Sequence, residues 1–155
     1  ADTCPASVVP EVKAVMDTIK TKFSDISRKN VGFGSTIFAV KPGDGSAREQ
    51  AASCQKVLGG WANIANEYAT KRYRSNLINW GMLPFIIDEG ELPFKNLDYL
   101  FLPNIRTAVE EGKSEFDAYV VKDGELKPFT LKMGALTPDE KEIILKGCLI
   151  NYYRG

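Results

Sequence analysis

Helical and strand-like segments alternate along most of this chain, and no other sequence feature restricts its fold as strongly. Apolar residues recur at helical spacing from Pro10 to Ile26, and proline suits the first position of a helix. The stretch 32–40 has the β-branched and aromatic composition of a strand. Further helices are expected at residues 47–58, 66–80 and 104–111, and further strands at 61–65, 83–87 and 98–102. The alternation predicts one mixed α/β domain.

Two local signals in the last third of the chain are stronger than the others. Asp123-Gly124 separates two strand-like runs, 116–122 and 126–132, which predicts a β-hairpin. Thr137, Pro138 and Glu140 have the spacing of a capping box with proline at the first helical position, which predicts the start of a last helix.

Composition excludes several classes of function. The 155 residues contain 20 basic and 20 acidic side chains, so no net charge favours nucleic acid, and no apolar run has the length of a membrane span. The chain has no histidine, which excludes a Ser-His-Asp or Cys-His centre built within it. The opening dozen residues lack the pattern of a signal peptide. Three separated cysteines, Cys4, Cys54 and Cys148, fit no disulfide framework or cluster motif; they predict buried thiols and a reducing compartment.

The stretch from Gly43 to Gln50 is the candidate functional site. Ser46 and Glu49 have capping-box spacing, which would place Ser46 at the start of the second helix. Glycine-rich backbone and a helix N-terminus favour a bound anion, and Arg48 adds a guanidinium suited to a carboxylate. The alternative is a purely structural role, in which the stretch forms a capped helix with a surface arginine. A phosphate-binding P-loop is disfavoured because GxxxxGK[ST] is absent.

Several motifs in this region, taken in order, resemble the C-terminal swivel domain of the aconitase and isopropylmalate dehydratase family. That family shows a Gly-x-Gly-Ser-Ser-Arg-Glu-His-Ala-Ala run, then Leu-Gly-Gly, then Asn-Leu before Gly-x-Leu-Pro. The ending 136–153 also resembles the family's closing helix. The matching positions are Gly43, Gly45, Ser46, Arg48, Glu49, Ala51, Ala52, Leu58, Gly59, Gly60, Asn76, Leu77, Gly81, Leu83 and Pro84.

The resemblance implies a compact α/β swivel domain over residues 1–155, with a mixed β-sheet or partial barrel wrapped by helices, belonging to a larger hydratase. It implies a hydro-lyase component that dehydrates and rehydrates a small hydroxy-carboxylic acid. By position, Ser46 would be the catalytic base and Arg48 the substrate ligand. A [4Fe-4S] cluster would lie in the partner domains or large subunit, without which this chain is inactive. The expected compartment is the cytoplasm, with the mitochondrial matrix as the alternative.

The chain departs from the family at Ala47 and Gln50, where the family often has serine and histidine, and the lost hydroxyl at Ala47 suggests a substrate other than citrate. The family's opening strand does not precede the motif, which favours a domain or fragment of a larger protein. The basic run from Lys71 to Arg74, with its interleaved tyrosine, leaves open an RNA-binding regulatory domain as a second function. Arg74 could instead face the active site. A third reading keeps Ser46 only as a helix cap in a domain whose catalysis has lapsed.

Overall fold

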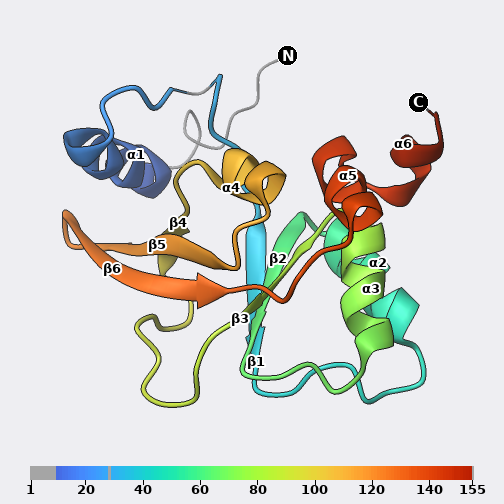
Figure 1. Cartoon of the computed structure of the whole chain (residues 1–155). Helices are drawn as coiled ribbons and strands as arrows, with labels where there is room; N and C mark the ends of the chain where they lie inside the picture. Colours follow the sequence, from blue (N-terminus) through green and yellow to red (C-terminus); the bar gives the residue numbers. More distant parts are fainter. Residues whose placement is uncertain (1–9, 28, 155) are drawn as a thin grey trace. The chain divides into compact units, whose positions relative to one another are not determined.

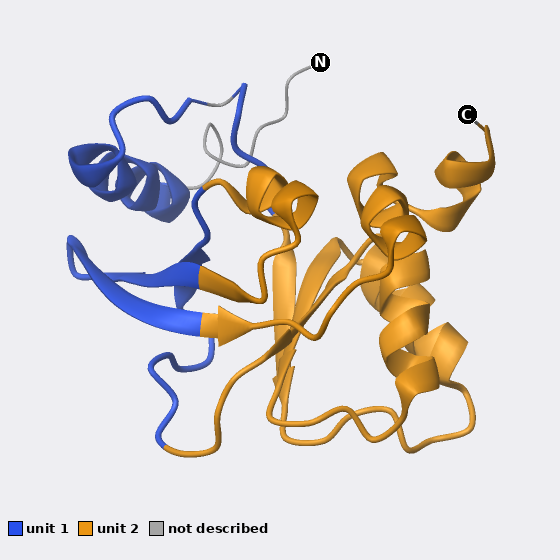
Figure 2. Ribbon diagram, viewed as in Figure 1, with its two compact units in different colours: residues 1–33, 91–103, 117–130 blue, residues 34–90, 104–116, 131–155 orange. Residues whose placement is uncertain are grey.

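The computed structural model describes residues 10–27 and 29–154, so Cys4 and most of the opening segment lie outside the described residues. The chain divides into two compact units, shown in Figure 2. The first comprises residues 1–33, 91–103 and 117–130, and the second residues 34–90, 104–116 and 131–155. Six strands hydrogen-bond in the order β1-β2-β3-β6-β5-β4. With helices on this mixed sheet, the predicted α/β fold class is confirmed.

The second unit contains the candidate site and is built on three parallel strands. These are β1 (Ser35–Ala39), β2 (Gly60–Ala65) and β3 (Leu83–Ile86), with Ile37 opposite Asn63 and Asn63 opposite Pro84. Two helices connect them, α2 (Arg48–Val57) and α3 (Lys71–Asn79), and lie side by side in Figure 1. Parallel pairing requires such crossover helices, so the loop after each strand lies at the same edge of the sheet.

The apolar contact between α2 and α3 fixes how these helices pack. Ala52 and Leu77 are fully buried, and they form one cluster with Tyr73 and Met82. Tyr68 and Trp80 pack against the same cluster from its margin. The small Ala52 side chain lets α2 approach α3 closely, so this cluster fixes how the two helices pack.

Three helices complete the second unit. They are α4 (Ile105–Glu111), α5 (Pro138–Lys146) and α6 (Leu149–Arg154). The predicted capping box at Thr137 is confirmed, since its hydroxyl accepts from the Glu140 N–H at 3.2 Å and the Glu140 carboxylate accepts from the Thr137 N–H at 2.9 Å. Gly147, at φ +90°, separates α5 from α6, so the ending forms two helices.

The first unit contains α1 (Pro10–Lys22), β4 (Tyr99–Phe101) and most of the hairpin formed by β5 (Glu115–Lys122) and β6 (Glu125–Lys132). Asp123 and Gly124 both have positive φ, as a two-residue hairpin turn of this kind requires, and the predicted hairpin is confirmed. Ile19, Phe101 and Val121 form its apolar cluster.

Three predicted details of the helices were wrong. The first helix ends at Lys22 and not at Ile26, although Phe23 and Ile26 still pack on the cluster of the first unit. The third helix begins at Lys71, because Thr70 caps it by accepting from the Tyr73 N–H at 3.2 Å. The inward face predicted for α2 was Ala47, Ala51, Cys54 and Leu58, but Ala52 is the buried residue and Leu58 is 83% exposed. The small residues of α2 give too weak a periodicity to set its register.

Candidate functional site

The loop that carries the motif leaves the carboxyl end of β1 and is fixed to the loop that follows β2. The Ala69 N–H donates to the Pro42 carbonyl at 2.9 Å, and the Thr70 hydroxyl donates to the Gly43 carbonyl at 3.1 Å. Gly43 has φ +100°, and a Cβ there would lie 2.5 Å from the Cβ of Tyr73. Only glycine fits this backbone against the tyrosine, so the turn is held rigidly on its inner side.

The outer side of the same turn is open. A Cβ built on Gly45 would meet nothing within 4 Å, and Ser46 is exposed. The Ser46 hydroxyl makes no hydrogen bond to the described part of the chain. A hydroxyl in this position is available to a ligand.

The predicted capping box at Ser46 was wrong. The N-cap of α2 is Ala47, which has no side-chain acceptor, and the first helical hydrogen bond runs from the Ala51 N–H to the Ala47 carbonyl at 2.9 Å. The Glu49 carboxylate, which a capping box would turn back to the N-cap backbone, instead accepts from the indole N–H of Trp80 at 3.1 Å. Ser46 precedes the N-cap by one residue.

A neighbouring helix supplies the missing cap. Asn76 of α3 accepts from the Glu49 N–H at 3.1 Å and donates to the Arg72 carbonyl at 3.3 Å when its amide is turned so that each end meets a complementary group. The opposite orientation would set oxygen against oxygen and N–H against N–H, so chemistry fixes the assignment. Sequence reasoning missed this role because the partners lie in different helices.

Arg48 is the first residue of α2 and is half-buried. Its Nε is buried without a hydrogen-bond partner in the described part of the chain. A buried donor of this kind is costly to leave unpaired, and a bound carboxylate is one group that could satisfy a guanidinium.

The other arginine singled out in the sequence, Arg74, makes structural contacts within the second unit. Its Nη2 donates to the carbonyls of Gly134 at 3.1 Å and Ala135 at 3.0 Å, and its Nη1 pairs with Glu140 at 3.4 Å. These contacts hold the segment that leads into α5. Tyr73, the aromatic residue of the basic run, is only 3% exposed and cannot stack on a nucleic-acid base. The structure therefore gives the RNA-binding alternative no support.

A buried polar network lies behind the motif loop, and sequence reasoning did not single it out. The Tyr73 hydroxyl accepts from the side-chain amides of Gln55 and Asn63, each at 3.0 Å. The Tyr68 hydroxyl donates to the Phe85 carbonyl at 2.9 Å, and burial raises the pKa of Tyr68. Asn63 is 2% exposed in an otherwise apolar strand. A polar residue within that apolar run was the feature of the sequence that could have pointed to a buried polar network. The network braces the loop and leaves Ser46 outside it.

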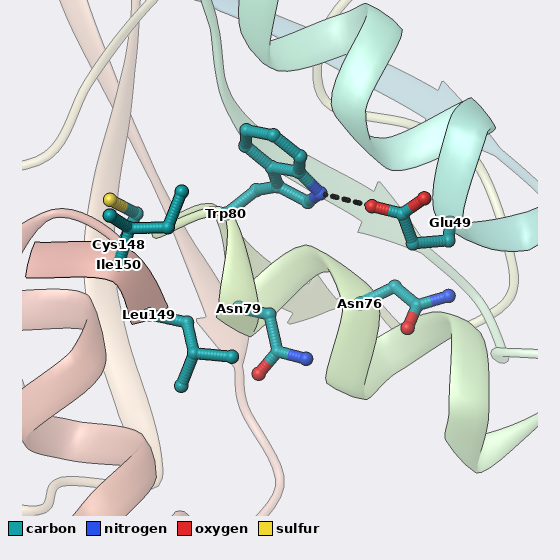
Figure 3. Close-up of a pocket in the computed structure, with 7 residues that line it drawn as sticks. All are labelled: Glu49, Asn76, Asn79, Trp80, Cys148, Leu149 and Ile150. Atoms are coloured by element: carbon teal, nitrogen blue, oxygen red, sulfur yellow. Dashed lines mark hydrogen bonds between the residues drawn. The ribbon is translucent and has the colours of Figure 1, made fainter. Parts of the chain in front are cut away.

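A cavity of about 230 Å³ opens beside the first turn of α2. Figure 3 shows the Trp80 indole reaching across to Glu49 at this cavity. Its lining comes from α2, from the end of α3 and from the segment around α6, and consists of Glu49, Asn76, Asn79, Trp80, Cys148, Leu149 and Ile150.

The described residues hold no group of three or more His, Cys, Asp or Glu side chains arranged for a metal ion. Cys54 is exposed and Cys148 only partly buried, so the prediction of buried thiols was wrong for both. No helix in the described ranges is long and apolar enough to cross a membrane.

Comparison with known proteins agrees with the fold and the motif. The family model described as the aconitase C-terminal domain matches residues 10–90. A search of curated proteins returned no match. Among solved structures, the chain resembles 3-isopropylmalate dehydratase (LeuD) of Methanocaldococcus jannaschii, with 30% identity and a TM-score of 0.56 over 81% of this chain. The match covers 66% of that neighbour, so this chain spans just under two thirds of its length. The chain belongs to the aconitase C-terminal domain family.

Proposed function

We propose that residues 1–155 act as the swivel domain or small subunit of an aconitase-like hydro-lyase, with Ser46 as the base and Arg48 as a carboxylate ligand. The observation that carries the proposal is the exposed, unbonded Ser46 hydroxyl, in a glycine-flanked turn directly before a helix that begins with Arg48. Family membership supports the reaction class. The likeness to a dehydratase supports a hydroxy-acid substrate and a larger partner subunit.

The reaction removes water from a hydroxy-acid. Ser46, as an alkoxide, takes a proton from the carbon next to a carboxylate, and a C=C bond forms as the C–O bond on the neighbouring carbon breaks. The departing hydroxide takes a proton from an acid of the partner and leaves as water, and Ser46 then releases its own proton before the next turnover; hydration is the reverse. A [4Fe-4S] cluster held by cysteines of the partner would supply a Lewis acid for that hydroxyl. Residues of this chain have to lower the cost of negative charge at Ser46 and hold the substrate.

The local electrostatics fit these tasks. The N-terminus of α2 presents backbone N–H groups and the positive end of a helix dipole, both of which favour an alkoxide or carboxylate. Arg48 adds a cation at the first helical position. Donors that are already in place stabilise developing charge better than water does, because they need not reorganise during the reaction.

Single substitutions in the assembled enzyme test the proposal. The chain would be purified anaerobically with its cluster-bearing partner, and the unsaturated product of 3-isopropylmalate or citrate would be followed by ultraviolet absorbance. We expect Ser46→Ala to lower kcat by about 10³-fold with little change in KM, the loss typical of a removed general base. Arg48→Lys should mainly raise KM, because lysine lacks the bidentate fork.

Ser53→Ala is the matched control. Ser53 lies within α2, the helix that follows Ser46, and its hydroxyl donates to the Gln50 carbonyl at 3.1 Å, so this variant should turn over like the parent. Near-normal turnover by Ser46→Ala, or an equal loss in Ser53→Ala, would contradict the assignment of Ser46 as the base.

A further inference from the structure

Two side chains on one face of α3 hold the same residue of α2. Asn76 lies in α3 and Trp80 is the C-cap residue of the same helix, four positions later, so both side chains lie on the same side. Asn76 accepts from the Glu49 backbone N–H at 3.1 Å, and the Trp80 indole donates to the Glu49 carboxylate at 3.1 Å. Figure 3 shows the Trp80–Glu49 bond and labels Asn76 with them among the residues that line the cavity. We call this pair of contacts the Asn76–Trp80 clamp.

The clamp holds the helix turn next to the proposed catalytic residues, whose positions the reaction depends on. Glu49 is the second residue of α2, directly after Arg48 and three residues after Ser46. Its N–H is one of the four at a helix start that have no partner within the helix. Ala47 has no side-chain acceptor for it, so the bond to Asn76 is the cap of this helix.

The base of the clamp is rigid. Leu77 and Ile78, which lie between Asn76 and Trp80, are both 0% exposed, so α3 is fixed in the core at this point. Asn76 is also tied to its own helix through the Arg72 carbonyl at 3.3 Å. A side chain anchored in this way can set the direction of the first turn of α2.

We propose that Asn76 and Trp80 are positioning residues for catalysis, which orient the turn that carries Ser46 and Arg48 by holding Glu49 from α3. This inference rests on the proposed function for its catalytic part. It assigns a task to the Asn-Leu pair of the sequence motif, in which Leu77 packs the two helices together and Asn76 caps the catalytic one.

Three variants and one control test the clamp. Asn76→Ala removes the acceptor, Asn76→Asp retains an acceptor oxygen facing the Glu49 N–H, and Trp80→Phe keeps an aromatic ring without the indole N–H. Asn79→Ala is the control: the same residue type on the same helix, lining the same cavity, without a bond to α2 in the described part of the chain.

The first measurement is amide hydrogen exchange at Glu49 in the 155-residue chain. We expect exchange in Asn76→Ala to be at least about tenfold faster, because the cap is lost. Exchange in Asn76→Asp and Asn79→Ala should stay within about threefold of the parent. Unchanged exchange in Asn76→Ala would show that the cap does not exist.

The second measurement is turnover of the assembled enzyme with the substrates named above. Asn76→Ala should lower kcat by about tenfold or more, since small misplacements of reacting groups cost this much, and Asn76→Asp should restore it to within about threefold. Trp80→Phe should give a smaller loss in kcat, and Asn79→Ala none. A role in stability alone would predict equal kcat for all folded variants, and that outcome would overturn the inference.

The two proposals fail in different ways. A parent enzyme without hydro-lyase turnover, or full turnover by Ser46→Ala, would overturn the proposed function and with it the catalytic part of the clamp. Exchange at Glu49 would still decide whether Asn76 caps α2. Normal catalysis by Asn76→Ala in an enzyme that needs Ser46 would overturn the clamp alone.

Discussion

Two glycines, each directly after the C-cap residue of α2 or α3, offer a matched pair of substitutions. Gly59 and Gly81 both have positive φ, +87° and +69°. A Cβ at Gly59 would meet nothing within 4 Å, whereas a Cβ at Gly81 would overlap the backbone carbonyl of Gly147 and lie 3.1 Å from its Cα. The same change to alanine therefore imposes the same kind of backbone strain at both sites and a clash with backbone at only one.

The expected costs follow from these two terms. Left-handed backbone costs an alanine about 1–2 kcal/mol, and the reduced freedom of the unfolded chain offsets part of this, so Gly59→Ala should lower the free energy of unfolding by about 1 kcal/mol. Gly81→Ala adds overpacking against backbone that cannot rotate away, about 2 kcal/mol more. Its total should be about 3 kcal/mol, and the difference between the two variants measures the contact between the end of α3 and the end of α5.

Urea unfolding followed by tryptophan fluorescence is the assay. Both tryptophans of the chain, Trp61 and Trp80, lie in the second unit, so the signal reports the part that contains both glycines. With a slope of about 2 kcal/mol per molar urea, the midpoint should fall by about 0.5 M for Gly59→Ala and about 1.5 M for Gly81→Ala. Equal shifts would refute the reasoning, because they would mean that the backbone of Gly147 yields without cost.

Two further predictions concern single hydroxyl groups. Ser46→Ala should change the free energy of unfolding by less than about 0.5 kcal/mol, as for an exposed residue that caps nothing, whereas Thr137→Ala should lose about 1 kcal/mol; a loss near 1 kcal/mol in both would restore Ser46 as a cap. Because burial raises the pKa of Tyr68 above its ordinary value near 10, the stability that its protonated hydroxyl contributes is present below pH 10 and is lost as the pH rises further. The advantage of the parent over Tyr68→Phe in urea should accordingly shrink from about pH 10 upward, and an advantage that grows there would contradict the assignment.

The parts of the fold that could be predicted from sequence are those decided within a few residues. The hairpin at Asp123-Gly124 needs only two residues that tolerate positive φ, and the capping box at Thr137 needs only one helical turn. The order of helices and strands followed from composition for the same reason. Ser46 had an equally good local signal, Glu49 three residues on, yet it caps nothing.

The predictions that were wrong concern features that depend on contacts between different helices and strands. The third helix begins late because Asn66 is used elsewhere: its amide donates to the Ile87 carbonyl at 3.1 Å and joins the ends of β2 and β3. The Tyr68 hydroxyl likewise bonds to the Phe85 carbonyl and remains in the loop. Such partners are distant in sequence, and a single sequence without aligned relatives gives no sign of them. The motif positions were found through resemblance, but the residues that hold them were not.

The absence of a cap role for Ser46 also bears on how a serine could act as a base. A serine at the N-cap uses its hydroxyl oxygen to accept a helix N–H, which ties up a lone pair and restricts the direction in which the oxygen points. In this chain Asn76 takes over that bond, and Ser46 keeps both lone pairs while still lying at the positive end of the helix. If Ser46 is the base, the cap supplied by α3 separates two tasks that one serine could not perform together: stabilising the start of the helix and removing a proton. If the proposed function holds, loss of Asn76 should recruit Ser46 to the vacant Glu49 N–H, and catalysis would fall even though the hydroxyl that acts as the base is still present.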